Sequence, residues 1–170
     1  MSTNGTRSPD VDLIPVNMTI NGRAVIDNVP PQLTLLEFLR DWLGLKGAKR
    51  SCDLQVCGAC TVVVDGMAVS SCTLLAFEVR DTLVTTIEGL AEDGELHPVQ
   101  QSFIDNAAFQ CGFCTPGMIM AAKSLLDQNP HPNEEEIRAY MKGNICRCTG
   151  YKKIVEAIEG AGRDAQDRNH

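Results

Sequence analysis

Short stretches in which apolar and polar residues alternate fill the first half of the chain. Alternation with a period of two is typical of a strand with one buried face. Two of these stretches are interrupted by Asn21-Gly22 and by Asp65-Gly66, and such dipeptides favour tight hairpin turns because both turn positions need a positive φ. The pattern therefore predicts two hairpins and one further strand, with strands at residues 16–20, 24–26, 61–64, 67–69 and 83–87.

A helix is predicted between the two hairpins. Thr34 and Glu37 have the spacing of a capping box, in which each side chain bonds the backbone N–H of the other residue. Apolar residues then recur every three or four positions until Gly44 ends the helix. We expect these residues to form a buried face, and they are Leu35, Leu36, Leu39, Trp42 and Leu43.

The apolar spacing becomes helical after the polar, glycine-containing segment 88–95. Pro98 predicts a helix start, and Thr115 with Pro116 predicts another in which threonine is the N-cap. The helices are expected at residues 98–108, 115–128, 133–141 and 151–161. The buried face of the first is expected to contain Val99, Phe103, Ile104, Ala107 and Ala108.

Together these patterns predict an α+β protein with two domains. Residues 14–90 would form a domain of strands with one helix, and residues 91–165 would form a domain of four helices. Residues 1–13 are polar and are expected to be a flexible tail.

Composition and charge argue against some classes of function and favour others. A chain of 170 residues can bury a sizeable core, and its net charge of −7 argues against nucleic-acid binding, because phosphates select basic faces. We expect no membrane span and a cytoplasmic location, since no long apolar run and no signal peptide are visible. Eight cysteines in such a chain indicate metal binding or catalysis, because disulfides are rare in the reducing cytosol.

Half of the cysteines follow the spacing C-x4-C-x2-C with a more distant fourth residue. This is the spacing of plant-type [2Fe–2S] ferredoxins. Gly58, inside the motif, would let the backbone approach closely and offer N–H groups to sulfur. Structural zinc sites are usually built from paired short spacers, so the spacing favours iron–sulfur over zinc or free thiols. We call Cys52, Cys57, Cys60 and Cys72 the first cysteine set.

The second cysteine set consists of Cys111, Cys114, Cys146 and Cys148. Its C-x2-C and C-x-C pairs indicate a metal site, but by themselves they support iron and zinc about equally. The two cysteines of a C-x-C pair must splay to reach one small ion, whereas a two-iron rhomb is wider. Arg147 lies between two of these cysteines, where it would either offset cluster or phosphate charge or simply be solvated.

Three motifs, CDLQVCGACTV, QCGFCTPGM and GNICRCTGY, occur in this order. Their order resembles the small iron–sulfur subunit of the xanthine dehydrogenase and aldehyde oxidase family of molybdenum hydroxylases, and especially the carbon monoxide dehydrogenase-like small subunits. The likeness covers residues 14–165 and places all eight cysteines on the family's ligands. It implies a β-grasp ferredoxin-like domain with a [2Fe–2S] cluster on the first cysteine set. It also implies a four-helix bundle with another [2Fe–2S] cluster on the second set.

The resemblance further implies cofactors and partners outside this chain. In the family the second cluster lies beside the molybdopterin of a large subunit, expected here as the cytosine dinucleotide. The first cluster lies toward the FAD of a medium subunit, and the assembly is a dimer of heterotrimers. Gln110 would contact the pterin, and Cys148 would approach its amino group. The family often has glycine at the positions of Ser51 and Gln55, so we expect the first cysteine loop to differ in conformation.

The expected function is electron transfer within an oxidoreductase complex, with no substrate chemistry on this chain. Electrons would pass from the molybdopterin centre through two clusters to the flavin. One alternative is a free-standing two-cluster ferredoxin, which would have no need of the helical second half. The other is a zinc-stabilised interaction module, which would contain zinc in place of iron.

Overall fold

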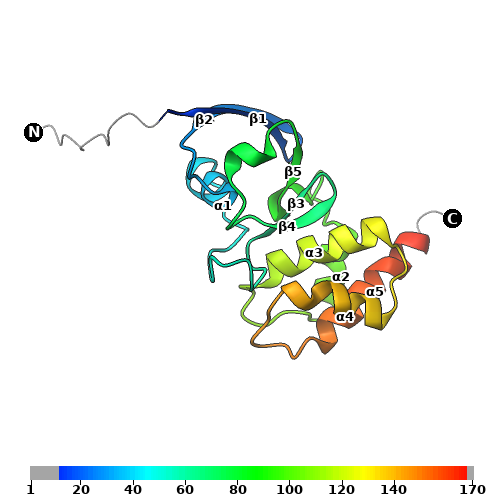
Figure 1. The fold of residues 1–170 in the computed structure, drawn as a ribbon. Coiled ribbons are helices and arrows are strands. Elements are labelled where there is room, and N and C mark those ends of the chain that lie inside the picture. The colour runs from blue at the N-terminus through cyan, green and yellow to red at the C-terminus, as the bar shows by residue number, and fades with distance from the viewer. Residues whose placement is uncertain (1–11, 168–170) are drawn as a thin grey trace, which may run out of the picture.

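The computed structural model describes residues 12–167, with side chains as far as residue 162. All but the last two residues of the predicted tail, 1–13, lie outside the described residues. Figure 1 shows a β-sheet at one end of the molecule and a group of helices at the other. This arrangement confirms the predicted α+β class.

Two antiparallel hairpins form the outer parts of one five-stranded sheet. Its strands are β1 (Ile14–Ile20), β2 (Arg23–Val29), β3 (Thr61–Val64), β4 (Met67–Ser70) and β5 (Leu83–Thr85), in the order β2-β1-β5-β3-β4. Only the β1–β5 pair within this sheet is parallel. All four turn residues have positive φ, as predicted: Asn21, Gly22, Asp65 and Gly66. The predicted strand 83–87 is shorter than expected, because a 3-10 turn begins at Ile87.

The helix after the first hairpin departs from its predicted regular form. The capping box of Thr34 and Glu37 is present, but α1 covers only Leu35–Glu37 before a π-helical turn, Phe38–Trp42. The amide of Leu43 bonds the carbonyl of Phe38 at 3.1 Å, which adds one residue to that turn. Trp42 therefore rotates off the buried face and is 44% exposed, while Phe38 is fully buried in the core.

The second half contains α2 (Pro98–Asp105), α3 (Thr115–Gln128), α4 (Glu134–Tyr140) and α5 (Lys152–Asp167). Pro98 lies in the first turn of α2 as predicted, but the N-cap of α3 is Cys114 and not Thr115. Helix α2 ends at Asp105, so Ala107 lies beyond it and is exposed, and Ile104 lies on the exposed side of the helix; both were predicted to be buried. None of the helices in residues 12–167 has the length and apolar character needed to cross a membrane.

Strand β3 contributes to both hydrophobic cores. Val62 packs in the core formed by the sheet and α1, whereas Val63 packs in the core formed by the helices. Successive side chains of a strand point to opposite faces, so β3 joins the two cores. Ser124 on α3 adds a polar connection, because its hydroxyl donates to the carbonyl of Gly66 at 2.7 Å and accepts from the amide of Ala68.

The two halves are in close backbone contact at Gly58, in the first cysteine loop. A Cβ atom added to Gly117 at the start of α3 would lie 2.2 Å from the Gly58 carbonyl oxygen. From the other side, the Ile145 amide donates to the carbonyl of Cys57 at 2.9 Å. This contact requires glycine at position 117, because the atom that a side chain would meet belongs to the backbone.

We predict that Gly117→Ala destabilises the protein by about 1–3 kcal/mol, as overpacking of a close contact does. Denaturant unfolding of the cluster-loaded chain would measure the loss. Gly143→Ala is the matched control, because a Cβ at Gly143 would meet nothing within 4 Å. Equal midpoints for the two variants would contradict the close contact.

Candidate metal centres

The first cysteine loop is wound tightly by residues in the left-handed region. Asp53, Gln55 and Gly58 have φ values of 52°, 58° and 65°. This winding turns the amides of Leu54 and Cys57 toward the Cys52 sulfur, each at 3.4 Å. Several amides of one loop directed at the same atom form a concavity that binds negative charge.

Two thiols of the first set have opposite environments. Backbone N–H groups that donate to the Cys52 sulfur lower the pKa of this thiol to about 6, and the N–H of Leu54 contributes most. Burial raises the pKa of Cys72 to about 11, although the Gln55 amide donates to its sulfur. Cys72 lies next to Cys60, whose carbonyl accepts a 2.7 Å hydrogen bond from the Ser71 hydroxyl. This bond ties the distant fourth cysteine to the loop that carries the other three.

The structure explains how glutamine can occupy position 55, where related proteins often have glycine. Its φ of 58° is a conformation that glycine adopts without strain, and here a glutamine adopts it. The Gln55 side chain accepts a hydrogen bond from the Thr73 hydroxyl at 3.2 Å. The loop is thus held by a side-chain contact that glycine could not make.

The second cysteine set is assembled from two loops that flank helices. Cys111 and Cys114 precede α3, and Cys146 and Cys148 precede α5. Cys148 donates to the Cys111 sulfur at 3.7 Å, and Cys114 lies against Cys146. The residues predicted to act together from sequence are therefore neighbours in the structure.

The two less exposed thiols of the second set, Cys114 and Cys146, have pKa values shifted in opposite directions. Burial, with the Cys146 thiol, raises the pKa of Cys114 to about 12. Burial acts to raise the pKa of Cys146 as well, but the Thr149 hydroxyl at 3.1 Å and the Thr149 amide outweigh it and lower that pKa. Tyr151 fixes the same loop, because its hydroxyl accepts from the Cys146 amide at 2.9 Å. Sequence reasoning treated Thr149 and Tyr151 only as the start of the last helix.

In each set the thiols form two neighbouring pairs. The pairs are Cys52 with Cys57, Cys60 with Cys72, Cys111 with Cys148, and Cys114 with Cys146. A separation of 3.7 Å is far too long for a disulfide. Two thiolates bound to one metal at tetrahedral angles, with metal–sulfur bonds of about 2.3 Å, lie about 3.8 Å apart. The separation of the two sulfur atoms matches that distance. Among the side chains that the structure describes, those of residues 12–162, no three of His, Cys, Asp or Glu gather as a group that could hold a single ion. Two pairs per set fit a two-metal cluster, in which each metal takes two thiolates.

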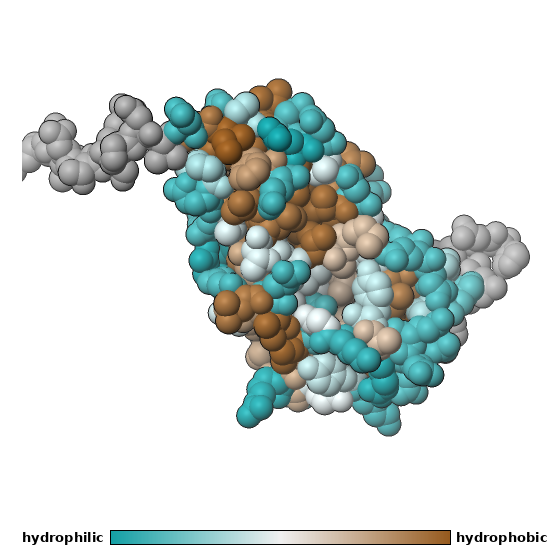
Figure 2. Space-filling model, in the orientation of Figure 1, coloured by the Kyte–Doolittle hydropathy of each residue, from teal (hydrophilic) through white to brown (hydrophobic). Residues whose placement is uncertain are grey.

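The second set opens onto the surface. Cys111 and Cys148 are exposed, as are Gln110 and Arg147 beside them. Next to them lies a mainly apolar groove of about 320 Å³, which reaches from Gly112 to side chains of α2 and α3. Figure 2 shows apolar side chains on the side of the molecule where the segment before β3 runs in Figure 1, near the junction of the sheet and the helices.

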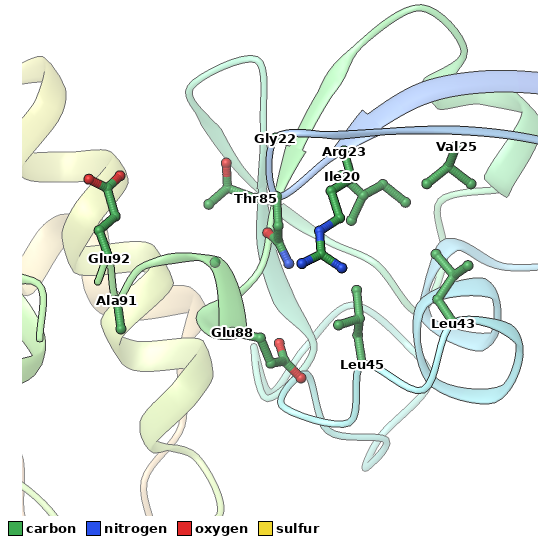
Figure 3. Close-up of a pocket in the computed structure, with 12 residues that line it drawn as sticks. Ile20, Gly22, Arg23, Val25, Leu43, Leu45, Thr85, Glu88, Ala91 and Glu92 are labelled. Carbon is green, nitrogen blue, oxygen red and sulfur yellow. The ribbon is translucent and has the colours of Figure 1, made fainter. Parts of the chain in front are cut away.

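A larger hollow, of about 640 Å³, lies away from the cysteines. It lies between the β1–β2 turn and the segment after β5, and Arg23, Leu45 and Glu88 are among its lining residues (Figure 3). No cysteine lines it. Glu88 is already bonded there by the Gly47 amide and the Thr86 hydroxyl. The chemistry of the chain is therefore centred on the two cysteine sets and not on this hollow.

Comparisons with known families agree with the two sites. Residues 18–86 match a family described as a 2Fe-2S iron-sulfur cluster binding domain. Residues 86–159 match a family described as a [2Fe-2S] binding domain. The two matches meet at residue 86, after β5, and each contains one cysteine set.

Similar proteins share nearly the whole chain. The nicotinate dehydrogenase small FeS subunit of Eubacterium barkeri is 47% identical over 148 residues, which cover 87% of this chain and 94% of the relative. A chain in the crystal structure of quinoline 2-oxidoreductase from Pseudomonas putida 86 superposes with a TM-score of 0.87 at 42% identity, covering 92% of this chain and 98% of that one.

The same fold also occurs inside longer proteins. The aldehyde oxidoreductase of Desulfovibrio desulfuricans ATCC 27774 has a TM-score of 0.86 and 41% identity over 90% of this chain, but only 17% of that chain is covered. The fold thus serves both as a separate subunit and as part of a larger polypeptide. The chain belongs to the family of small [2Fe–2S] iron–sulfur subunits of molybdenum hydroxylases, and its role is electron transfer in an oxidoreductase complex.

Proposed function

We propose that each cysteine set is the complete protein ligand set of one [2Fe–2S] cluster. Cys52, Cys57, Cys60 and Cys72 would hold the first, and Cys111, Cys114, Cys146 and Cys148 the second. The observation that carries this proposal is that the cysteines of each set are neighbours in the structure, within a segment that matches a [2Fe–2S] binding family. Thiolate ligation is favoured by the donors on two of these sulfurs, the loop amides at Cys52 and Thr149 at Cys146.

The two clusters would belong to two domains. Residues 14–90 would act as a β-grasp ferredoxin-like domain, and residues 91–165 as a four-helix bundle made of α2, α3, α4 and α5. The division is supported by the two separate hydrophobic cores. The clusters supply one-electron carriers, and this chain positions them and sets their surroundings.

The partners would be a large molybdopterin subunit and a medium FAD subunit, in a dimer of heterotrimers in the cytoplasm. The pterin would be the cytosine dinucleotide form. Relatives named as small subunits support the existence of such partners. Electrons would enter at the second cysteine set, where Gln110 and Cys148 would face the pterin, and leave from the first set toward the flavin. The exposure of Gln110, Cys111 and Cys148 supports a partner contact at the second set, because a partner could reach those thiols directly.

The apolar groove beside the second set would contact the large subunit. Leu96, Ile104 and Phe109 line it and are 42%, 50% and 41% exposed. The groove also includes Gly112 and Thr115, which lie between and beside Cys111 and Cys114. A partner that covers the exposed thiols would therefore cover the groove too.

The alternatives account for less of the molecule. A free-standing ferredoxin would not explain the likeness to small subunits over 94% of a relative's length. A zinc-stabilised module would not explain why each half of the chain matches a [2Fe–2S] binding family. Neither alternative is favoured.

We predict that Cys148→Ser removes the second cluster and leaves the first. Iron should fall from about four to about two atoms per chain, because each [2Fe–2S] cluster needs four protein ligands. Metal analysis with EPR of the reduced protein would measure this. Cys72→Ser is the matched variant and should remove the other signal. If Cys148→Ser abolished only the signal that Cys72→Ser abolishes and kept the other, the grouping of ligands would be wrong.

Gln110→Ala should weaken assembly with the large subunit by several-fold without loss of iron. Removal of one hydrogen bond at a partner surface costs about 0.5–1.5 kcal/mol. The affinity of the purified subunits and the iron content would be measured together. Gln101→Ala, at an exposed glutamine of α2, serves as the control. Equal affinities for the two variants would refute a pterin contact at Gln110.

Ile104→Lys should reduce copurification of the large subunit by at least about tenfold, because a charge would be buried in an apolar contact. Ile26→Lys places the same change on β2 at a side chain that is already 79% exposed, and should have no effect. Pull-down of the complex at matched expression would be the measurement. Equal recovery with both variants would show that the groove does not face the large subunit.

A further inference from the structure

Asn144 connects the two cysteine loops through its side chain. It lies two residues before Cys146 and is only 7% exposed. Its side-chain amide donates to the Gly58 carbonyl at 3.1 Å and to the Thr61 hydroxyl at 3.2 Å. A residue of the second loop therefore bonds both ends of the segment that contains Cys60.

The Gly58 carbonyl is the fixed point of this contact. It accepts from the Thr61 hydroxyl at 2.7 Å and the Thr61 amide at 3.1 Å, in addition to Asn144. A peptide unit is planar, and its C=O and N–H point in opposite directions in the trans form. Three donors on the Gly58 carbonyl thus also fix the direction of the Ala59 N–H, in the middle of the first loop.

The contact leaves no room for the first loop to relax toward the second. A Cβ on Gly58 would lie 2.4 Å from the Gly143 carbonyl and 2.5 Å from the Asn144 amide nitrogen. On the other side of Gly58 lies Gly117, three residues after Cys114. Both segments that hold the first loop in place therefore also carry cysteines of the second set.

We infer that Asn144 is a positioning residue that couples the two cysteine sites, so that a formed second site holds the first loop in its ligand-binding shape. The inference rests on the ligand assignment proposed above. Backbone amides near a cluster's sulfurs tune its potential, so the fixed direction of the loop peptides would set the potential of the first site as well as its stability. Coupling between two sites is reciprocal, so loss of the first site would also weaken the second.

Asn144→Ala, in the full chain assembled with its clusters and partners, tests this coupling. We expect the first-site EPR signal to disappear about ten times faster on addition of an iron chelator, as loss of a buried hydrogen bond would cause. The midpoint potential of the first site should shift as well. Ser124→Ala is the matched control, because Ser124 is fully buried and also bonds across the two halves, to Gly66, without touching a cysteine loop. It should leave both quantities unchanged.

Thr61→Val provides a second variant, since it removes the Thr61 hydroxyl with almost no change of shape. It should accelerate first-site loss in the same direction, and it keeps the test decisive if Asn144→Ala fails to fold. Cys146→Ser should also accelerate first-site loss, and its combination with Asn144→Ala should fall short of the product of the single effects. Multiplicative effects would show that Asn144 does not carry the coupling.

The outcomes separate this inference from the proposed function. A wild-type protein without two cluster signals would overturn the ligand assignment itself. Two clusters in the wild type, with first-site loss and potential unchanged in Asn144→Ala and Thr61→Val, would overturn only the coupling. Equal changes in Asn144→Ala and Ser124→Ala would do the same, because the effect would then be general to the contact between the halves.

Discussion

The close backbone contact around Gly58 holds the two cysteine loops against each other. Gly117 must lack a side chain for α3 to approach the Gly58 carbonyl, and the Ile145 amide closes the same region from the other side. Because Cys57 and Cys60 flank Gly58, this contact fixes one cysteine set against the other. The sheet and the helices each have a core of their own. The contact at Gly58 fixes the position of one cysteine set relative to the other.

The surroundings of the sulfurs suit a pair of electron-carrying clusters. Each set has a thiol whose pKa is lowered by donated hydrogen bonds, from loop amides at Cys52 and from Thr149 at Cys146. Each set also has a thiol in which burial raises the pKa, at Cys72 and at Cys114. A bound metal would offset that burial by holding the thiolate form. The exposed thiols of the second set leave one side open to a partner, as transfer between subunits requires.

Local patterns in the sequence predicted much of this structure. The Asn21-Gly22 and Asp65-Gly66 turns and the Thr34 capping box follow from short-range chemistry, and all are present. Cysteine spacing, with the family resemblance, grouped the thiols as the structure places them. The π turn that exposes Trp42 was not predictable, because an added residue in a helical turn leaves the apolar periodicity almost unchanged. The contacts of Asn144 and Gly117 with Gly58 could not be predicted from local patterns either, because they join segments more than fifty residues apart.

If each cysteine set holds a two-iron cluster, the intact chain carries four iron and four sulfide ions. Native mass spectrometry of the intact chain, with EPR of the reduced sample, would measure this content. We expect a mass increase equal to two [2Fe–2S] clusters and two distinct signals from one polypeptide. A chain that carried zinc, or a single cluster, with a colourless or one-signal sample would contradict it.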